Sequence, residues 1–501
     1  MEWNDVVAIG PLVAAVAVAI AVLIVDLALP GQRTVVLAVT FVGLAIVAGL
    51  TWQTGQSETA ILGFGGAYKV DDLTTFLDLL FIAIVALTVA FAPDYLLPRN
   101  LPIAEFVVTL VFAMCGAMLI AASSDLLLLF LGLELMVLPG YMLAGFHKTD
   151  GYSTEGAIKY FLLGSFSSAI FLFGLAFVWG LTGSTRVADV SAQLDPTVLS
   201  PALAMGLAFM TAGVAFKIAA VPFHYWTPDA YQGSPTPVTG YLSVGPKVGA
   251  FALALRLFVE TLGPLREHWM IVIVVLAAVT MTLGNLVALT QTNVKRMLAY
   301  SSIAHTGYIL VGLAAFAGGS ITIGGADTQT PGLEGLLYYS AAYAFMNLGA
   351  FAVVAALQKR AGVTSGLTTF AGLGRREPLL AVLMTLFLLS LTGIPPTAGF
   401  FAKAYVILAA VEVGGIVAAL AVLTVLNAAI AAFYYLRVVV YMFMREPTGE
   451  DEPVGHGRLL WAGLAAATVA TIAFGVLPNQ LLDVVRDAAA ALTSAPVTVG
   501  R

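Results

Sequence analysis

Residues 216–230 read FKIAAVPFHYWTPDA, and this stretch decides how the chain must fold. Lys217 stands in an apolar run that Pro222 and Pro228 then interrupt. Proline lacks a backbone N–H donor and clashes with the carbonyl one turn earlier, so a helix through this run opens there. Inside a membrane the freed carbonyls need protein or water partners, which favours a buried or water-filled site at the break.

A second stretch repeats this arrangement. Residues 391–403 read LTGIPPTAGFFAK, in which Pro395 and Pro396 precede Lys403. Discontinuous spans of this kind form the transport sites of many membrane transporters. Ordinary proline kinks are frequent in membrane helices, but here a break and a lysine occur together twice. The pairing favours a transport site over simple kinks.

The composition of the chain places these runs in a membrane. Of the 501 residues, 60% are hydrophobic and 10% are charged, and the mean hydropathy is +0.98. Soluble domains carry about 25% charged residues. The single cysteine, Cys115, excludes a disulfide framework and cannot hold an iron-sulfur cluster alone. The 22 Lys and Arg residues are scattered, so nucleic acid is not an expected partner.

We therefore predict an all-α polytopic membrane protein of about 14 transmembrane helices, with two inverted five-helix repeats and broken helices seven and twelve. The two broken spans are five apart, so they cross the membrane in opposite directions, as inverted repeats would. The predicted spans are 5–29, 34–52, 72–92, 103–121, 124–145, 155–182, 200–224, 236–260, 268–290, 296–317, 332–357, 378–411, 415–443 and 458–478.

Four regions follow from these spans. They are the N-terminal three helices (1–102), a first repeat (103–260), a second repeat (261–445), and a last helix with a short tail (446–501). Residues 183–199 and 318–331 are expected to be polar loops, 446–457 an acidic loop and 479–501 an amphipathic tail.

Loop charges predict the orientation, because Lys and Arg are retained on the cytoplasmic side. Loops after even-numbered spans hold three such residues, Lys69, Arg186 and Arg266. Loops after odd-numbered spans hold Arg33, Arg99, Lys148, Lys295, Arg296, Lys359, Arg360, Arg375, Arg376, Arg445 and Arg458. We therefore expect both termini on the outer face of a bacterial inner membrane.

Four ionisable residues lie deep inside predicted spans: Glu134, Lys217, Lys247 and Lys403. A charge at the bilayer centre costs at least about 2.5 kcal/mol. Burial disfavours the charged form of a lysine, and a nearby carboxylate favours it. A lysine beside a movable glutamate can therefore load and release a proton. A static ion pair is the alternative, but buried pairs contribute little stability.

Two further residues have open roles. His305 lies about nine residues into span ten, where its imidazole suits either a proton relay near neutral pH or a structural hydrogen bond. Lys159, near the cytoplasmic end of span six, suits either a proton entrance or a snorkelling anchor.

The remaining charges in the spans have simpler explanations. Arg256 and Arg437 lie near span ends, so they are expected to snorkel. Asp78 is expected to pack against polar groups, Asp229 to cap the second half of span seven, and His224 to hydrogen-bond within the broken segment instead of binding metal.

Taken together, the motifs resemble those of the antiporter-like subunits of proton-pumping NADH:quinone oxidoreductase, respiratory complex I, a family similar to cation/proton antiporter subunits. The resemblance covers nearly the whole chain. It rests on residues 217–230, GSPTPV at 233–238, and residues 295–308 and 393–403. Subunit N is the most similar type, by LELMVLP at 133–139, YLSVGPK at 241–247, and lysine at 403 where subunit M-like chains carry glutamate.

This resemblance implies a place in the membrane arm, between antiporter-like neighbours. It makes Glu134 and Lys217 the charge pair of an input half-channel, Lys247 the bridging residue and Lys403 the output group. It implies a translocase subunit with no cofactor in this chain, in which NADH, quinone, flavin and iron-sulfur clusters belong to partner subunits.

Two alternatives stay open at the level of sequence. A sodium/proton antiporter subunit would share the same half-channels and would lack only the subunit N-like motifs. The other alternative is a purely structural membrane subunit. Such a subunit would need no buried titratable groups beside broken helices, and the four such groups of this chain count against it.

Overall fold

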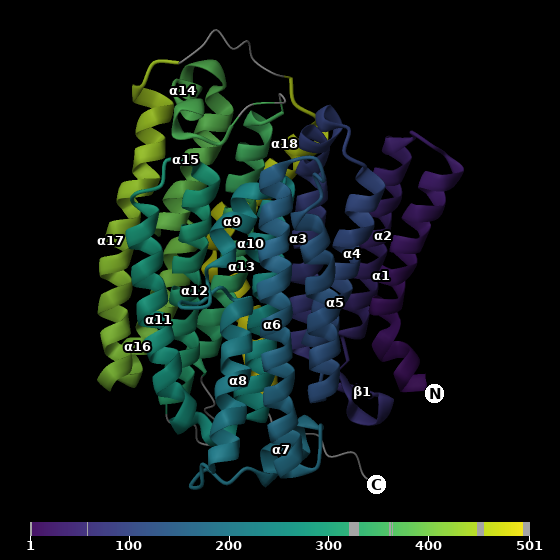
Figure 1. Cartoon of the computed structure of the whole chain (residues 1–501), viewed down its shortest axis with the longest axis vertical. Helices are drawn as coiled ribbons and strands as arrows, with labels where there is room; N and C mark the ends of the chain where they lie inside the picture. The colour runs from purple at the N-terminus through teal and green to yellow at the C-terminus, as the bar shows by residue number, and fades with distance from the viewer. Residues whose placement is uncertain are drawn as a thin grey trace.

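Nearly all of the chain forms helices that stand side by side along one axis of the molecule (Figure 1). The computed structural model describes residues 3–57, 59–319, 330–359, 362, 364–447 and 455–493. Twelve of the described helices are long and apolar enough to cross a membrane by length and composition. The two broken spans add two more crossings, so the prediction of 14 is confirmed.

The bounds of the described elements, in chain order, are as follows. The first half comprises α1 (Trp3–Ala28), α2 (Arg33–Thr54), β1 (Ile61–Gly63), η1 (Phe64–Gly66), β2 (Tyr68–Val70), α3 (Asp72–Leu96), η2 (Leu97–Arg99), α4 (Ile103–Ala121), α5 (Leu126–Ala144), α6 (Gly151–Thr182), α7 (Val187–Gln193), α8 (Pro201–Lys217), α9 (Trp226–Gly233), α10 (Thr236–Ala254) and η3 (Leu255–Thr261). The second half comprises η4 (Gly263–Leu265), α11 (Arg266–Ala288), α12 (Val294–Gly318), α13 (Pro331–Leu357), η5 (Leu367–Phe370), α14 (Leu373–Arg376), α15 (Pro378–Thr392), α16 (Ala398–Val413), α17 (Gly415–Met444), α18 (Arg458–Val476) and α19 (Pro478–Thr493).

Both proline-containing stretches break their spans. α8 ends at Lys217 and α9 resumes the crossing at Trp226, while α15 ends at Thr392 and α16 resumes at Ala398. In Figure 1, α8 rises from the end of the bundle that carries α7, whereas α15 descends from the end that carries α14. We call these the α7 end and the α14 end. The broken spans therefore run in opposite directions, as predicted.

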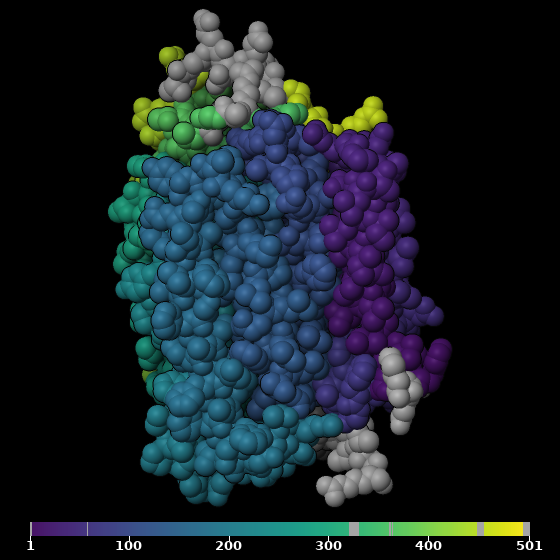
Figure 2. Space-filling view, turned by 45° about the vertical axis from the view of Figure 1, so that its right-hand side comes forward, coloured from purple at the N-terminus to yellow at the C-terminus, as the bar shows by residue number. Residues whose placement is uncertain are grey.

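Three helices form the centre of the bundle. The apolar stretch of α10 is 100% buried inside the chain, that of α12 is 94% buried and that of α13 is 89% buried. The corresponding share is 33% in α1 and α2. α1 and α2 form a ridge along one side, purple in Figure 2. The central helices are long enough to span a membrane and yet face other helices, so their polar side chains meet one another instead of lipid.

Some local features differ from the predictions. Residues 61–63 and 68–70 pair as a small antiparallel hairpin where a loop was expected. The segment 183–199 contains α7, and the tail contains α19 up to Thr493. The rest of the tail, residues 320–329, Arg360 and residues 448–454 lie outside the described residues. The division of the chain at residues 102, 260 and 445 stays a prediction.

Candidate functional site

Lys217 is the last residue of α8 and is buried at the first break. Its ammonium donates to the hydroxyl of Ser168 at 2.9 Å and to the carbonyl oxygen of Gly164 at 3.4 Å. The hydroxyl of Tyr141 also lies 3.4 Å away. A lysine held by hydroxyls and a carbonyl can exist in either protonation state, because these partners need not themselves be charged.

Glu134 lies on α5 and does not meet Lys217 directly. It is two turns from Tyr141, on the same face of the helix. Within the part of the chain that the structure describes, its buried Oε1 has no hydrogen-bond partner, and no ion pair joins it to Lys217. The structure places Lys217 against Tyr141 and does not join it to Glu134 as the expected charge pair.

Lys247 lies in the middle of α10, at the centre of the bundle. Its ammonium donates to the carbonyl oxygen of Ser302 at 2.6 Å and to the hydroxyl of the same residue at 2.5 Å. The ring of Tyr343 lies 5.7 Å from the ammonium, within cation–π range. Ser302 lies on α12, and one turn further along α12 the hydroxyl of Thr306 donates to the carbonyl of Ile218 at 2.7 Å. Lys247 and the first break are thus linked through α12.

His305 follows Ser302 by one turn of α12 and is 1% exposed. Its Nδ1 lies 2.8 Å from the hydroxyl of Tyr339, and its Nε2 lies 3.3 Å from the hydroxyl of Tyr435. Tyr435 in turn hydrogen-bonds Ser301. The imidazole therefore has a hydroxyl at each ring nitrogen, an arrangement that can pass a proton from one side of the ring to the other.

Lys403 lies on α16 and reaches back across the second break. Its ammonium donates to the carbonyl oxygens of Leu391 and Thr392, both at 2.7 Å, which are carbonyls that the break frees. Gly393 allows this approach, because its φ is +96° and a Cβ there would lie 3.0 Å from Cδ of Lys403. The ring of Tyr308 lies 5.1 Å from the ammonium.

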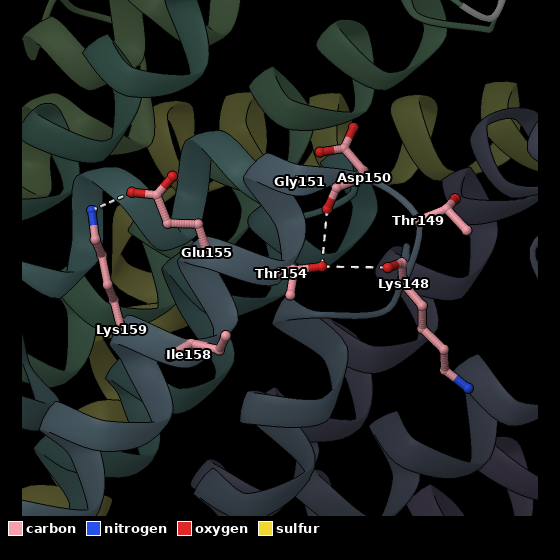
Figure 3. Close-up of a pocket in the computed structure, with 8 residues that line it drawn as sticks. All are labelled: Lys148, Thr149, Asp150, Gly151, Thr154, Glu155, Ile158 and Lys159. Atoms are coloured by element: carbon pink, nitrogen blue, oxygen red, sulfur yellow. Dashed lines mark hydrogen bonds and ion pairs between the residues drawn. The ribbon is translucent and has the colours of Figure 1, made fainter.

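Lys159 is partly exposed at the α14 end, so it does not belong to the buried group. Its ammonium lies 2.7 Å from carboxylate oxygens of both Glu155 and Asp229. Asp229 therefore pairs with a lysine and does not cap α9 as predicted. Lys159 lines a groove of about 600 Å³ on the surface at the start of α6 (Figure 3), together with Lys148, Thr149, Asp150, Gly151, Thr154, Glu155 and Ile158.

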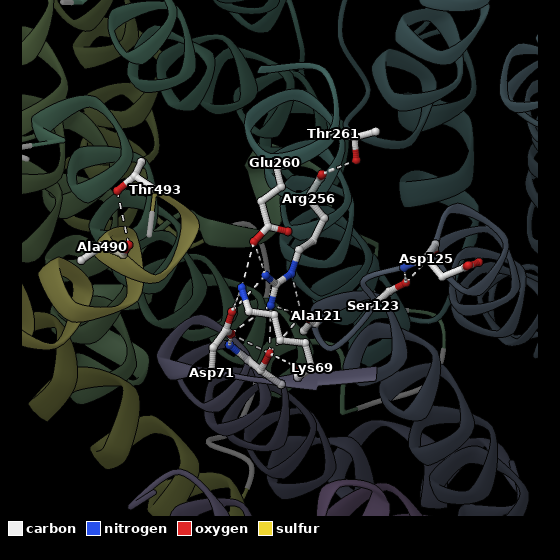
Figure 4. A network of polar contacts seen from close by, with 11 residues as sticks. Lys69, Asp71, Ala121, Ser123, Asp125, Arg256, Glu260, Thr261, Ala490 and Thr493 are labelled. Atoms are coloured by element: carbon white, nitrogen blue, oxygen red, sulfur yellow. Dashed lines mark hydrogen bonds and ion pairs between the residues drawn. The ribbon is translucent and has the colours of Figure 1, made fainter. Parts of the chain in front are cut away.

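The prediction that Arg256 snorkels is wrong. Arg256 is 0% exposed in the π-helical segment η3, and it donates to Asp71 at 2.9 Å and to Glu260 at 2.7 Å (Figure 4). Lys69 lies 2.9 Å from the same aspartate. Burial alone would raise the pKa of Asp71, but the charges of Arg256 and Lys69 outweigh burial and hold that pKa well below its usual range. The guanidinium stays inside because carboxylates surround it.

A second ionic cluster ties the last span to the α14 end. His456 lies 2.8 Å from a carboxylate oxygen of Glu377 and 3.5 Å from one of Asp94, and Lys359 lies 3.3 Å from the same Asp94 oxygen. Burial by itself lowers the pKa of His456, but its contacts with the two carboxylates outweigh burial and raise the pKa to about 9. The imidazolium therefore joins α3 to the start of α15.

Lys295 was counted among the loop cations, and the structure corrects this. It lies in the first turn of α12, is 4% exposed, and donates to the carbonyl oxygen of Ser234 at 2.5 Å. Asn293 caps α12 through its side chain, which accepts from the backbone N–H of Arg296, and this capping residue was the sequence signal that could have placed Lys295 inside the helix. Among the described residues, no three His, Cys, Asp or Glu side chains gather as a metal site would require.

Comparisons with known proteins match this chain to one family. The family model described as NADH:quinone oxidoreductase/Mrp antiporter, TM, matches residues 123–428, which include both breaks and each of the buried lysines and His305. A relative from Koribacter versatilis, NADH-quinone oxidoreductase subunit N 1, is 42% identical over 481 residues, which are 93% of this chain and 92% of the relative.

Solved structures show the same fold. A chain of respiratory complex I from Thermus thermophilus with bound aureothin aligns with a TM-score of 0.77 and 30% identity, over 95% of this chain and 99% of that one. A chain of the Mrp complex from Dietzia sp. aligns with a TM-score of 0.82 and 23% identity, over 99% and 98% of the two chains. The second likeness concerns the fold alone.

Proposed function

Because this chain belongs to the NADH:quinone oxidoreductase/Mrp antiporter family of membrane subunits, and within it to the subunit N type, we propose that it carries protons along a row of buried residues. The row consists of Glu134, Lys217, Lys247, His305 and Lys403. The chain is an antiporter-like membrane subunit of an NADH-quinone oxidoreductase. The proposal assigns the translocation of protons to particular side chains.

The observation that carries the proposal is that α12 connects the first break, Lys247 and His305. Lys217 ends α8, and the next residue, Ile218, accepts a hydrogen bond from Thr306 of α12. The same hydroxyl lies 3.2 Å from the carbonyl oxygen of Ser302, the residue that accepts hydrogen bonds from Lys247. His305 stands between these two residues on α12. The row thus passes through the most buried helices of the bundle.

Each group in the row has a chemical role. Glu134 and Lys217 take up a proton at the first break, Lys247 bridges the two repeats, His305 relays through its two hydroxyl neighbours, and Lys403 releases the proton at the second break. Amines and an imidazole suit these roles because each can hold or give up a proton, whereas arginine cannot.

The redox chemistry lies in partner subunits. This chain then needs no flavin, iron-sulfur cluster or quinone site of its own, and it acts as a non-redox part of a translocating enzyme. Its partners are antiporter-like neighbours and other membrane-arm subunits, the lipid bilayer, protons and internal water. The relatives at 42% and 41% identity are NADH-quinone oxidoreductase subunits N, which favours this assignment over a sodium/proton antiporter subunit.

The α14 end faces the cytoplasm in this proposal, and both termini face outward in a bacterial inner membrane. Cysteines at exposed positions on the α14 end and on the α7 end test this orientation. A thiol introduced by Thr149→Cys is expected to react with an impermeant reagent only from the cytoplasmic side, and one introduced by Asp195→Cys only from the outer side. The reversed pattern would contradict the orientation.

Lys247→Met tests the row itself. The substitution removes the bridging amine and keeps a long side chain in the same space. In the assembled complex in proteoliposomes, proton uptake per NADH oxidised is expected to fall, whereas Arg33→Met, an exposed cation of α2, is expected to leave it unchanged. Wild-type proton uptake by an assembled Lys247→Met complex would overturn the proposal.

A further inference from the structure

The short helix α9 is held from both sides by charged side chains at the α14 end. A carboxylate oxygen of Asp229 lies 2.7 Å from the ammonium of Lys159 on α6, and the other lies 2.7 Å from the guanidinium of Arg296 on α12. Arg296 also donates to Gln232 of α9 at 3.0 Å. Asp229 is thus the shared partner of two cations on two different helices.

Glycines bring α9 unusually close to α6. A Cβ at Gly156 would lie 2.9 Å from the carbonyl oxygen of Asp229 and 3.2 Å from Cα of Ala230. At Gly233 a Cβ would collide with the carbonyl oxygen of Tyr152. These neighbours are backbone atoms, so a Cβ at either position would require the two helices to move apart. The ion pairs of Asp229 with Lys159 and Arg296, which we call the clamp, therefore hold α9 against α6 at a distance that larger residues would prevent.

One turn before Asp229, Trp226 begins a series of aromatic contacts that reaches Lys217. Its ring stacks on that of Tyr160, with centroids 4.1 Å apart and planes 10° apart. Tyr160 meets the ring of Tyr141 edge-on at 4.6 Å, and the hydroxyl of Tyr141 lies 3.4 Å from the ammonium of Lys217. These rings lie in succession between the charged cluster and the first buried lysine.

The order of residues along α6 supports this placement. Lys159 belongs to the clamp, Tyr160 follows, and Gly164 and Ser168, which contact Lys217, lie one and two turns deeper. A residue at position 160 therefore stands between the surface and the lysine. Tyr160, which stacks on Trp226, therefore lies between the clamp and the amine of Lys217.

Trp226 also touches the backbone beside Lys217. Its Nε1 donates to the carbonyl oxygen of Phe216 at 3.1 Å, and its ring lies 5.6 Å from that of Phe216. A shift of α9 would break this hydrogen bond as well as the stack on Tyr160. The position of α9 is therefore coupled to the residue preceding Lys217 in the chain.

A hollow lies at the α14 end beside Asp229. A cavity of about 110 Å³, enough for several waters, is lined by Asp229 and Arg296 together with Tyr152, Glu155, Gly156, Gln232 and Gly233. Asp229 is partly exposed to it, whereas Trp226 and Tyr160 are buried. The hollow gives water access to Asp229 and Arg296, and the rings of Trp226 and Tyr160 do not line it.

We propose that Asp229 is a positioning residue that holds Trp226 and Tyr160 as a closed gate between the α14 end and Lys217. With its negative charge in place, Asp229 keeps α9 fixed to Lys159 and Arg296. Once that charge is neutralised, α9 is released, Trp226 leaves the ring of Tyr160, and water reaches the first buried amine. This inference rests on the proposed function, for which the gate controls proton uptake.

Thiol accessibility tests the gate without reference to pumping. Ser168→Cys places a thiol beside Lys217, and a small impermeant methanethiosulfonate is added to vesicles that expose the α14 end. In the complex with Ser168→Cys alone, modification located at residue 168 by mass spectrometry is expected to be slow. Adding Asp229→Asn or Trp226→Leu is expected to raise the rate at least about tenfold, whereas Asp195→Asn, an exposed carboxylate at the α7 end, is expected to leave it unchanged.

A third variant keeps the charge of Asp229 and moves the helix. Gly156→Ala is expected to push α9 away from α6 and so to raise the rate of thiol modification at residue 168. This result would show that the effect is not specific to the Asp229→Asn substitution. Acceleration by Trp226→Leu without acceleration by Asp229→Asn would show that the rings close the path and Asp229 does not hold them. No acceleration by any of the three would overturn the gate itself. Neither result depends on whether Lys247→Met pumps.

Discussion

Lys217 gives its hydrogen bond to Ser168, at 2.9 Å, while the carboxylate of Glu134 stays apart from it. Glu134 and Tyr141 share one face of α5, and Tyr141 is the residue of that face that reaches the lysine. The lysine is therefore within the electrostatic influence of the glutamate without being joined to it. This arrangement fits the proposed role of Glu134 as a switch for Lys217 better than the role of a fixed anchor.

We expect Glu134→Gln to reduce proton translocation more than it reduces assembly, because the neutral side chain no longer favours the charged form of Lys217. Ser168→Ala should act in the same direction, since a hydrogen bond to a charged group is worth roughly 1.5–3 kcal/mol. Ser168→Thr, which keeps the hydroxyl, is the matched control. Proton uptake by proteoliposomes measures all three, and normal uptake by an assembled Glu134→Gln complex would contradict the role.

Lys403→Ala should lower proton translocation and coupled quinone reduction together, because the output group is lost and a blocked channel holds back the redox steps. Lys403→Arg should rescue only in part. Arginine can donate to the carbonyls of Leu391 and Thr392 but cannot release its proton. Proton uptake recorded alongside NADH oxidation checks both, and full pumping by the alanine variant would leave Lys403 a structural charge.

Arg256→Met should destabilise the subunit by about 3–5 kcal/mol, because it leaves the carboxylate of Asp71 buried without its guanidinium partner. The double variant with Asp71→Asn is expected to recover part of this loss. The thermal midpoint of the solubilised complex is the measurement, with Arg186→Met as a control at the same end. A midpoint unchanged by Arg256→Met would show that the network of Figure 4 contributes nothing to stability.

The contacts of His456 should weaken as the pH rises. Its folded pKa of about 9 lies above its unfolded value of 6.5, so its contribution to stability is complete below about pH 6.5 and is lost as the pH rises through about 9. Hydrogen exchange at the amide of Gly457, which donates to Asp94 at 2.9 Å, reports this loss after correction for intrinsic rates. His456→Gln should exchange with no such transition, and a transition that persists in this variant would refute the assignment.

The spans were predictable because each is a long apolar run bounded by charge, glycine or proline. The break in span seven was predicted as well, but the end of that span was not: it was placed at residue 224, whereas α9 continues the crossing from Trp226 to Gly233. The hairpin at 61–70 was missed because strands of three residues are too short to show an alternating pattern.

The buried amines were predictable from their apolar surroundings, but their partners were not. Ser168, Ser302 and Tyr339 are distant in sequence from the residues they contact, and these meetings are set by how helices pack. Lys295 was misplaced for a related reason. A cation at the edge of an apolar run reads as a loop residue until packing shows that another helix covers it.

The two broken spans carry a further consequence through their peptide dipoles. α8 and α15 run toward the middle of the molecule from opposite ends, and each stops there with its carbonyl pole, which is negative, facing inward. Lys217 terminates one pole and Lys403 is bound to the other. The chain thus contains two helix ends that attract a positive charge, in opposite orientations. Their dipoles alone favour neither direction of transport, so the direction must come from groups that the two sites do not share, such as Glu134 of α5 near the first.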